Sequence, residues 1–145
     1  MTTHPDDEVP PDALTRLRAI CGQLPDAYEE QAWIGTRWRI RGRTFAHVYV
    51  TDPTRPSSTH THTAAPTTTL TFRAQGEELA ALTHAGPPFF RLDWGANVVG
   101  LRLYEDTTDW AEVAELLMES YRLQAPKKLA ALLDDREDGP SSPGR

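Results

Sequence analysis

The sequence has a single cysteine, Cys21, among its 145 residues. One cysteine excludes a disulfide within the chain and agrees with a reducing compartment. The sequence contains no run of about 18 apolar residues, so it predicts no transmembrane helix. The N-terminus, MTTHPDDEVPPDA, lacks the basic and then apolar pattern of a secretory signal. We therefore expect a cytoplasmic protein with no membrane partner.

The chain also lacks the motifs of common catalytic and metal sites. It has no glycine-rich phosphate loop, no Gly-x-Ser-x-Gly elbow and no metal-ligand spacing. His60 and His62, in STHTHT, have no third and fourth ligand near them. Cys21 lies on the apolar stripe of an expected helix, where a free cysteine is ordinary packing. We therefore predict no enzymatic activity, no cofactor and no bound metal.

The net charge of −6 is unevenly distributed along the chain. Residues 1–12 and 134–145 hold 8 of the 21 acidic side chains but only 2 of the 15 basic ones. The body of the chain is therefore neutral, and the acidity belongs to its ends. A neutral body is less basic than a typical DNA-binding domain, although acidic ends can lie far from a binding face.

The composition predicts one domain over residues 12–133, between disordered acidic tails at 1–11 and 134–145. Residues 52–67 are rich in threonine, serine and proline, and we expect them to form a flexible loop. Apolar periodicity and turn residues predict helices over residues 12–24, 77–83 and 109–125, more helical turns over 127–133, and strands around Trp33 and over 37–41, 44–50, 68–73 and 97–103. This order indicates an α+β fold.

Two N-caps are expected from the sequence. Asp12 precedes the apolar stripe of the first helix, and Asp109 and Glu112 have capping-box spacing at the start of the last long helix. Along that last helix, one face is apolar and the opposite face is acidic. The apolar stripe consists of Trp110, Val113, Leu117 and Tyr121. We therefore expect this helix to cover the core.

Four arginines alternate with other residues in TRWRIRGRTFA, at positions 37, 39, 41 and 43. Side chains of a strand point alternately to opposite faces. With a hairpin turn at Gly42, we expect Trp38 and Ile40 to share the helix-covered face with Phe45. Arg37 and Arg39 then point to the other face, beside Ala46 and Val48, while Arg41 and Arg43 lie at the turn. His47, which alternates with Phe45 and Tyr49, is expected in the core or at its edge.

Two segments resemble the MmcQ/YjbR family of small bacterial proteins. WIGTRWRIRGRTFA, at residues 33–46, is similar to the family's Trp-Gly-x-Pro-x-Phe-Arg-Val-x-Gly-Lys-x-Phe-Ala, although Ile34 and Thr36 replace its glycine and proline. ESYRLQAPKK, at residues 119–128, is similar to Glu-Ser-Tyr-x-Leu-x-Ala-Pro-Lys. The resemblance covers about residues 13–133. It implies a frataxin-like (CyaY-like) two-layer sandwich, in which helices pack on one face of an antiparallel sheet and the other face stays open.

The resemblance also implies DNA binding, which is the function the family is labelled with. Our leading hypothesis is weak, phosphate-directed binding of DNA through the open sheet face. The residues assigned to it are Arg37, Arg39, Arg41, Arg43, Lys127 and Lys128. The alternatives are a protein-interaction or small-ligand module on the same face, or arginines that simply pair with glutamates. A frataxin-like fold also suggests iron handling by the acids between Glu105 and Glu119, but a solvated helix face explains those acids better.

Overall fold

The computed structural model describes residues 9–32, 34–51, 67–92 and 97–133. In chain order, its elements are α1 (Pro11–Cys21), β1 (Tyr28–Gln31), β2 (Thr36–Ile40), β3 (Arg43–Thr51), β4 (Thr67–Arg73), α2 (Gly76–Ala85), β5 (Phe89–Arg91), β6 (Val98–Arg102) and α3 (Trp110–Gln124). A last helical segment covers residues 127–133. In the described part of the chain, no helix is both long and apolar enough to cross a membrane.

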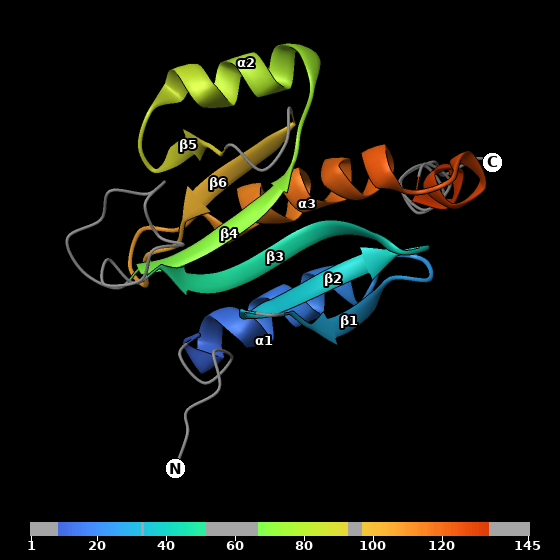
Figure 1. Cartoon of the computed structure of the whole chain (residues 1–145), viewed down its shortest axis with the longest axis horizontal. Coiled ribbons are helices and arrows are strands. Elements are labelled where there is room, and N and C mark those ends of the chain that lie inside the picture. The colour runs from blue at the N-terminus through green and yellow to red at the C-terminus, as the bar shows by residue number, and fades with distance from the viewer. Residues whose placement is uncertain (1–8, 33, 52–66, 93–96, 134–145) are drawn as a thin grey trace, which may run out of the picture.

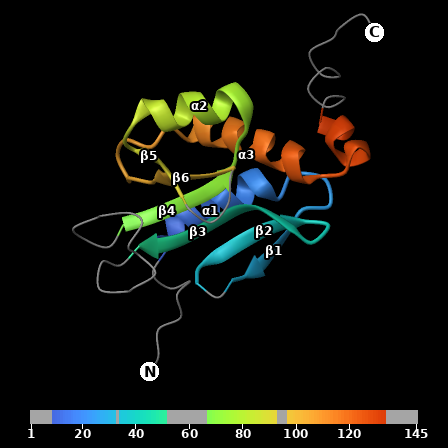
Figure 2. The same cartoon turned by 45° about the horizontal axis from the view of Figure 1, so that its top comes forward.

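The strands form one six-stranded antiparallel sheet in the order β1-β2-β3-β4-β6-β5. Figures 1 and 2 show α1 and α3 crossing the same side of this sheet, with α2 over β5 and β6. Apolar side chains of α1 and α3, among them Leu17 and Leu117, pack on strand residues such as Trp38. The expected α+β fold, with helices on one face of an antiparallel sheet, is confirmed. We call the face turned away from the helices the open face.

The last long helix forms as its sequence predicts. The carboxylate of Asp109 accepts hydrogen bonds from the backbone N–H groups of Ala111 and Glu112, at 3.1 and 3.2 Å. Val113, Leu117 and Tyr121 of the apolar stripe are buried. Capping by Asp109 gives hydrogen-bond partners to backbone N–H groups that have none within the helix. Burial of the apolar stripe supplies most of the free energy that holds the helix on the sheet.

Other expectations need correction. Helix α1 begins at Pro11, and Pro10 is its N-cap, so the prediction of Asp12 as the cap is wrong. Proline is well suited to the first helical position, because a backbone N–H group there would have no hydrogen-bond partner within the helix. Asp12 instead pairs with Arg16 one turn later, at 3.1 Å. The short strand β5 was not expected, and Val9, assigned to the N-terminal tail, is buried.

Several sequence predictions concern segments outside the described residues. These are most of the two tails (residues 1–8 and 134–145), nearly all of the loop at 52–67 with His60 and His62, and Trp33. The strand expected around Trp33 corresponds to β1, which ends two residues before it.

The β2–β3 hairpin turns at Arg41 and Gly42, whose φ angles are 51° and 81°. Positive φ at both central residues is the requirement of the two-residue type I′ turn. Trp38, Ile40 and Phe45 are buried on the helix-covered face, as the alternation predicts. Register across the hairpin is interrupted, however, because Trp38 pairs with Ala46 whereas Arg39 pairs with Thr44.

This β-bulge leaves Phe45 as an extra residue in β3 and overturns one part of the prediction. Ala46 and Val48 lie on the helix-covered face, because they pair with Trp38 and Thr36 of β2. They are therefore not the neighbours of the arginines, as the uninterrupted alternation suggested. The residues beside Arg37 and Arg39 are His47 and Thr44. A bulge places two consecutive residues against one on the partner strand, which shifts the alternation by one position.

Candidate functional site

The open face carries an excess of positive charge. Strand register places four arginines on it and, among the described residues, one carboxylate, that of Glu30. The arginines are Arg37 and Arg39 on β2, Arg73 on β4 and Arg102 on β6. These four are a minority of the 15 basic residues of the chain, so the excess on this face arises because few described carboxylates share it. Such a local field attracts anionic groups regardless of the overall net charge.

Glu30 lies between the two arginines that the sequence singled out on β2. Its Oε1 atom is 2.5 Å from the Arg37 Nη2 atom and 3.2 Å from the Arg39 Nη1 atom. The hydrogen bond from Arg37 is the main cause that holds the pKa of Glu30 below its usual range, and Arg39 adds to it against a smaller effect of burial. Arg39 also donates to the carbonyl of Gly42 at the hairpin turn. Both guanidinium groups are therefore held in place, and one carboxylate partly neutralises them.

The other predicted cations lie at one end of the molecule. Arg41 pairs with Asp26 at 3.0 Å. Arg43 is exposed and has no ion pair within the described part of the chain. Lys127 and Lys128 are exposed at the start of the last helical segment. The side-chain amide of Gln124 donates to the Thr44 carbonyl at 3.0 Å, so this end of α3 lies next to the start of β3 (Figure 1).

Sequence reasoning missed Arg73 and Arg102. Arg73 is half-buried, and its guanidinium makes no hydrogen bond or ion pair to another described residue. Arg102 lies over the ring of Phe90, with its Cζ atom 4.9 Å from the ring centroid. Both arginines stand singly in β-rich segments, TTLTFR and NVVGLRL, where the sequence shows no arginine alternation. Only strand order brings them to the same face as Arg37.

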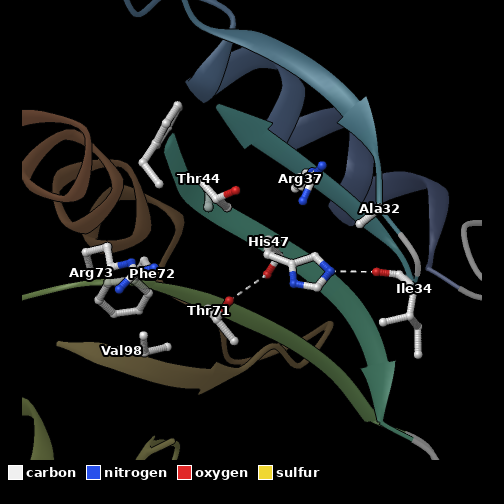
Figure 3. Close-up of a pocket in the computed structure, with 11 residues that line it drawn as sticks. Ala32, Ile34, Arg37, Thr44, His47, Thr71, Phe72, Arg73 and Val98 are labelled. Atoms are coloured by element: carbon white, nitrogen blue, oxygen red, sulfur yellow. Dashed lines mark hydrogen bonds between the residues drawn. The ribbon is translucent and has the colours of Figure 1, made fainter. Parts of the chain in front are cut away.

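A pocket of about 380 Å³ opens on this face between the β1–β2 turn and strands β2, β3, β4 and β6 (Figure 3). The side chains that Figure 3 labels around it include the cations Arg37 and Arg73, the hydroxyl residues Thr44 and Thr71, the apolar residues Ala32, Ile34 and Val98, and His47 at its centre. The Nε2 atom of His47 donates to the carbonyl of Ile34 at 2.5 Å, which holds the imidazole ring against the turn. Polar groups in an apolar hollow are typical of a ligand site.

The acidic face of α3 meets α2 along a groove lined by Glu78, Glu112, Glu115 and Glu119. Burial and the nearby Glu119 raise the pKa of Glu78 above its usual range. No three His, Cys, Asp or Glu side chains come together as metal ligands within the residues that the structure describes.

Cys21 is fully buried, and burial raises the pKa of its thiol, so it is inert packing rather than a nucleophile.

The fold and this face define an α+β protein with one helix-covered and one basic sheet face. Its sequence matches the model of the YjbR family over residues 22–123, and the chain belongs to that family. The crystal structure of Deinococcus radiodurans protein DR2400, with a domain described as DUF419, has a similar fold. The TM-score is 0.57 at 19% sequence identity, with 76% of each chain covered. No protein with a curated description matches this chain.

Proposed function

We propose that this protein is a non-enzymatic, nucleic-acid-binding protein that acts in the cytoplasm and contacts phosphate groups through its open face. The observation that carries the proposal is the excess of four arginines over one carboxylate on that face. Guanidinium groups form charge-assisted hydrogen bonds to phosphate oxygens, and such contacts position a protein on a nucleic acid without selecting a sequence.

Within this proposal, the arginines have different roles. Arg73 is available for a phosphate, because no described residue pairs with it. Arg37 and Arg39 must first release Glu30, so their net contribution to affinity is reduced. Arg41, Arg43, Lys127 and Lys128 extend the basic surface around the end of the sheet. We therefore expect weak binding with a strong dependence on salt.

Fluorescence anisotropy with labelled DNA across a salt series tests the proposal. Each phosphate contact that is lost reduces the slope of log affinity against log salt concentration by about 0.7–0.9. We expect Arg73→Gln to reduce both the affinity and this slope. Arg16→Gln is the matched control, since Arg16 on α1 loses the same charge on the helix side. An absence of binding at low salt, or equal binding by wild type and an Arg37→Glu/Arg39→Glu variant, would contradict the proposal.

A second candidate is a protein-interaction or small-ligand module on the same face. It is favoured by the carboxylates of Glu30 and Asp26, which pair with Arg37, Arg39 and Arg41. In that case, a specific protein should be retained by the wild type and lost from the Arg37→Glu/Arg39→Glu variant, while DNA fails to bind at any salt concentration.

A further inference from the structure

The pocket of the open face is hollowed into the sheet itself. Its centre is formed by neighbouring residues of two strands, since His47 of β3 pairs with Thr71 of β4. The Thr71 hydroxyl donates to the His47 carbonyl at 3.5 Å, and the ring of Tyr49 lies 5.0 Å from the imidazole, centroid to centroid. The Tyr49 contact and the Nε2 hydrogen bond to Ile34 hold the ring in one orientation. The hollow is therefore formed before any ligand arrives.

The apolar part of the lining does not suit phosphate groups alone, because phosphate oxygens need charged or polar partners. Its volume of about 380 Å³ is near the lower end of the range for small-ligand pockets, about 300–1,000 Å³. Ile34 and Val98 give it apolar walls, and Thr44 adds a hydroxyl group (Figure 3). Arg37 and Arg73 stand on opposite sides of it. A planar base suits the hollow, and the guanidinium groups suit the phosphates on either side of that base.

We propose that this pocket receives one unpaired nucleotide, so that the open face binds single-stranded nucleic acid in preference to duplex. Unpaired bases bind proteins by stacking on rings such as histidine and by hydrogen bonds from their edges. His47 supplies the ring and Thr44 a hydroxyl group, while the Thr71 hydroxyl, which donates to the His47 carbonyl, can accept a hydrogen bond from the base. This inference rests on the proposed function. The same chemistry would accept a free mononucleotide. Binding experiments with nucleic acid and with a free mononucleotide distinguish these two ligands.

The test compares a labelled single strand with its duplex of equal length, using wild type and two pocket-filling variants. The variants are Thr44→Trp and Ala32→Trp, which close the hollow from different sides. Thr15→Trp is the matched control, because Thr15 is exposed on α1. Thermal unfolding of each variant verifies that it is folded. If Thr44→Trp does not fold, Ala32→Trp alone tests the pocket.

We expect wild type and Thr15→Trp to bind the single strand about fivefold or more tighter than the duplex, as stacking of one base allows. Both pocket variants should lose most of this preference while keeping their affinity for duplex. The preference is diagnostic, because the duplex has the higher charge density and would bind more tightly if phosphates alone mattered.

The possible outcomes distinguish a failure of the nucleotide pocket from a failure of the proposed phosphate binding. Equal or tighter binding of duplex by wild type, or a preference that survives in every pocket variant that folds, would overturn the pocket inference and leave phosphate binding standing. Binding of free deoxyadenosine monophosphate that Thr44→Trp abolishes, with no binding of either nucleic acid, would keep the nucleotide pocket and overturn the proposed function.

Discussion

The hydroxyl of Ser120 donates a hydrogen bond of 2.6 Å to the carbonyl of Phe45, across 75 positions of sequence. The same oxygen accepts a hydrogen bond of 2.8 Å from the backbone N–H group of Arg73. One buried hydroxyl on α3 therefore joins β3 at its bulge to β4 at its end. The next residue, Tyr121, packs edge-on against Phe45 and donates to the Pro25 carbonyl at 2.7 Å. The segment ESYRLQAPKK, which carries part of the family resemblance, thus has a structural role at Ser120 and Tyr121.

Replacing Ser120 with alanine should destabilise the protein by about 2–3 kcal/mol, since two buried backbone groups would lose their partner. Urea unfolding measures this free energy. The neighbouring Glu119→Ala is the control, and we expect it to cost less than about 0.5 kcal/mol because Glu119 is exposed. A loss of less than about 0.5 kcal/mol in Ser120→Ala would show that water replaces the hydroxyl.

Glu30→Gln should strengthen nucleic-acid binding, because it removes the carboxylate that Arg37 and Arg39 share. We expect an increase of about two- to tenfold at low salt, with a steeper salt dependence. Glu29→Gln is a matched control on the adjacent position of β1, where the carboxylate pairs with Arg18 at 2.9 Å instead. Anisotropy titrations compare the three proteins. Equal affinities for Glu30→Gln and wild type would mean that Arg37 and Arg39 do not touch the ligand.

Gly100→Ala should destabilise the sheet, because the ring of Phe90 occupies the space that a Cβ atom would need. The nearest ring atom would lie 2.4 Å from that Cβ. Moving the ring also disturbs its contact with the Arg102 guanidinium. Overpacking of this kind costs about 1–3 kcal/mol. A double variant, Gly100→Ala with Phe90→Leu, should recover part of the loss in chemical unfolding, whereas no recovery would show that the contact with the Phe90 ring is not the cause.

Glu78→Gln should raise the melting temperature at neutral pH by about 1–2 °C. The pKa of Glu78 is raised in the folded state by burial and by Glu119, so the native protein binds this proton more tightly than the unfolded chain. The stability that the protonated group contributes is complete below its ordinary pKa of 4.5 and is lost as the pH rises through the raised value. The advantage of the variant should therefore vanish toward pH 4. Glu77→Gln, on the exposed side of α2, is the control, and we expect no gain in its melting temperature at neutral pH.

Much of the fold follows from local patterns. The stripe of α3, its Asp109 cap and the hairpin at Gly42 are all visible in the sequence, because periodicity and turn chemistry depend on neighbouring residues. Strand β5 was missed, since three residues after a proline pair show no period. The N-cap of α1 was misplaced because Asp12 has the residue type of a cap, whereas Pro11 already has the backbone conformation of the first helical residue.

The candidate site was predictable only in part. Alternation in TRWRIRGRTFA correctly separates Trp38 and Ile40 from Arg37 and Arg39, because strand side chains alternate whatever lies beside them. The bulge at Phe45 could not be seen, since it is a property of two paired strands and of the Ser120 hydroxyl that binds there. For that reason, His47 was expected near the core rather than at the centre of an open-face pocket.

The sequence by itself determined most of the segments that become helices and strands, which face of β2 is apolar, and that the acidity lies in the two ends. Only the tertiary structure decided which charges meet. Strand order placed Arg73 and Arg102 on the same face as Arg37. The register of β1 placed Glu30 beside Arg37. The physical reason is that alternation is a local property of one strand, whereas a binding surface is assembled from strands whose partners lie tens of residues apart.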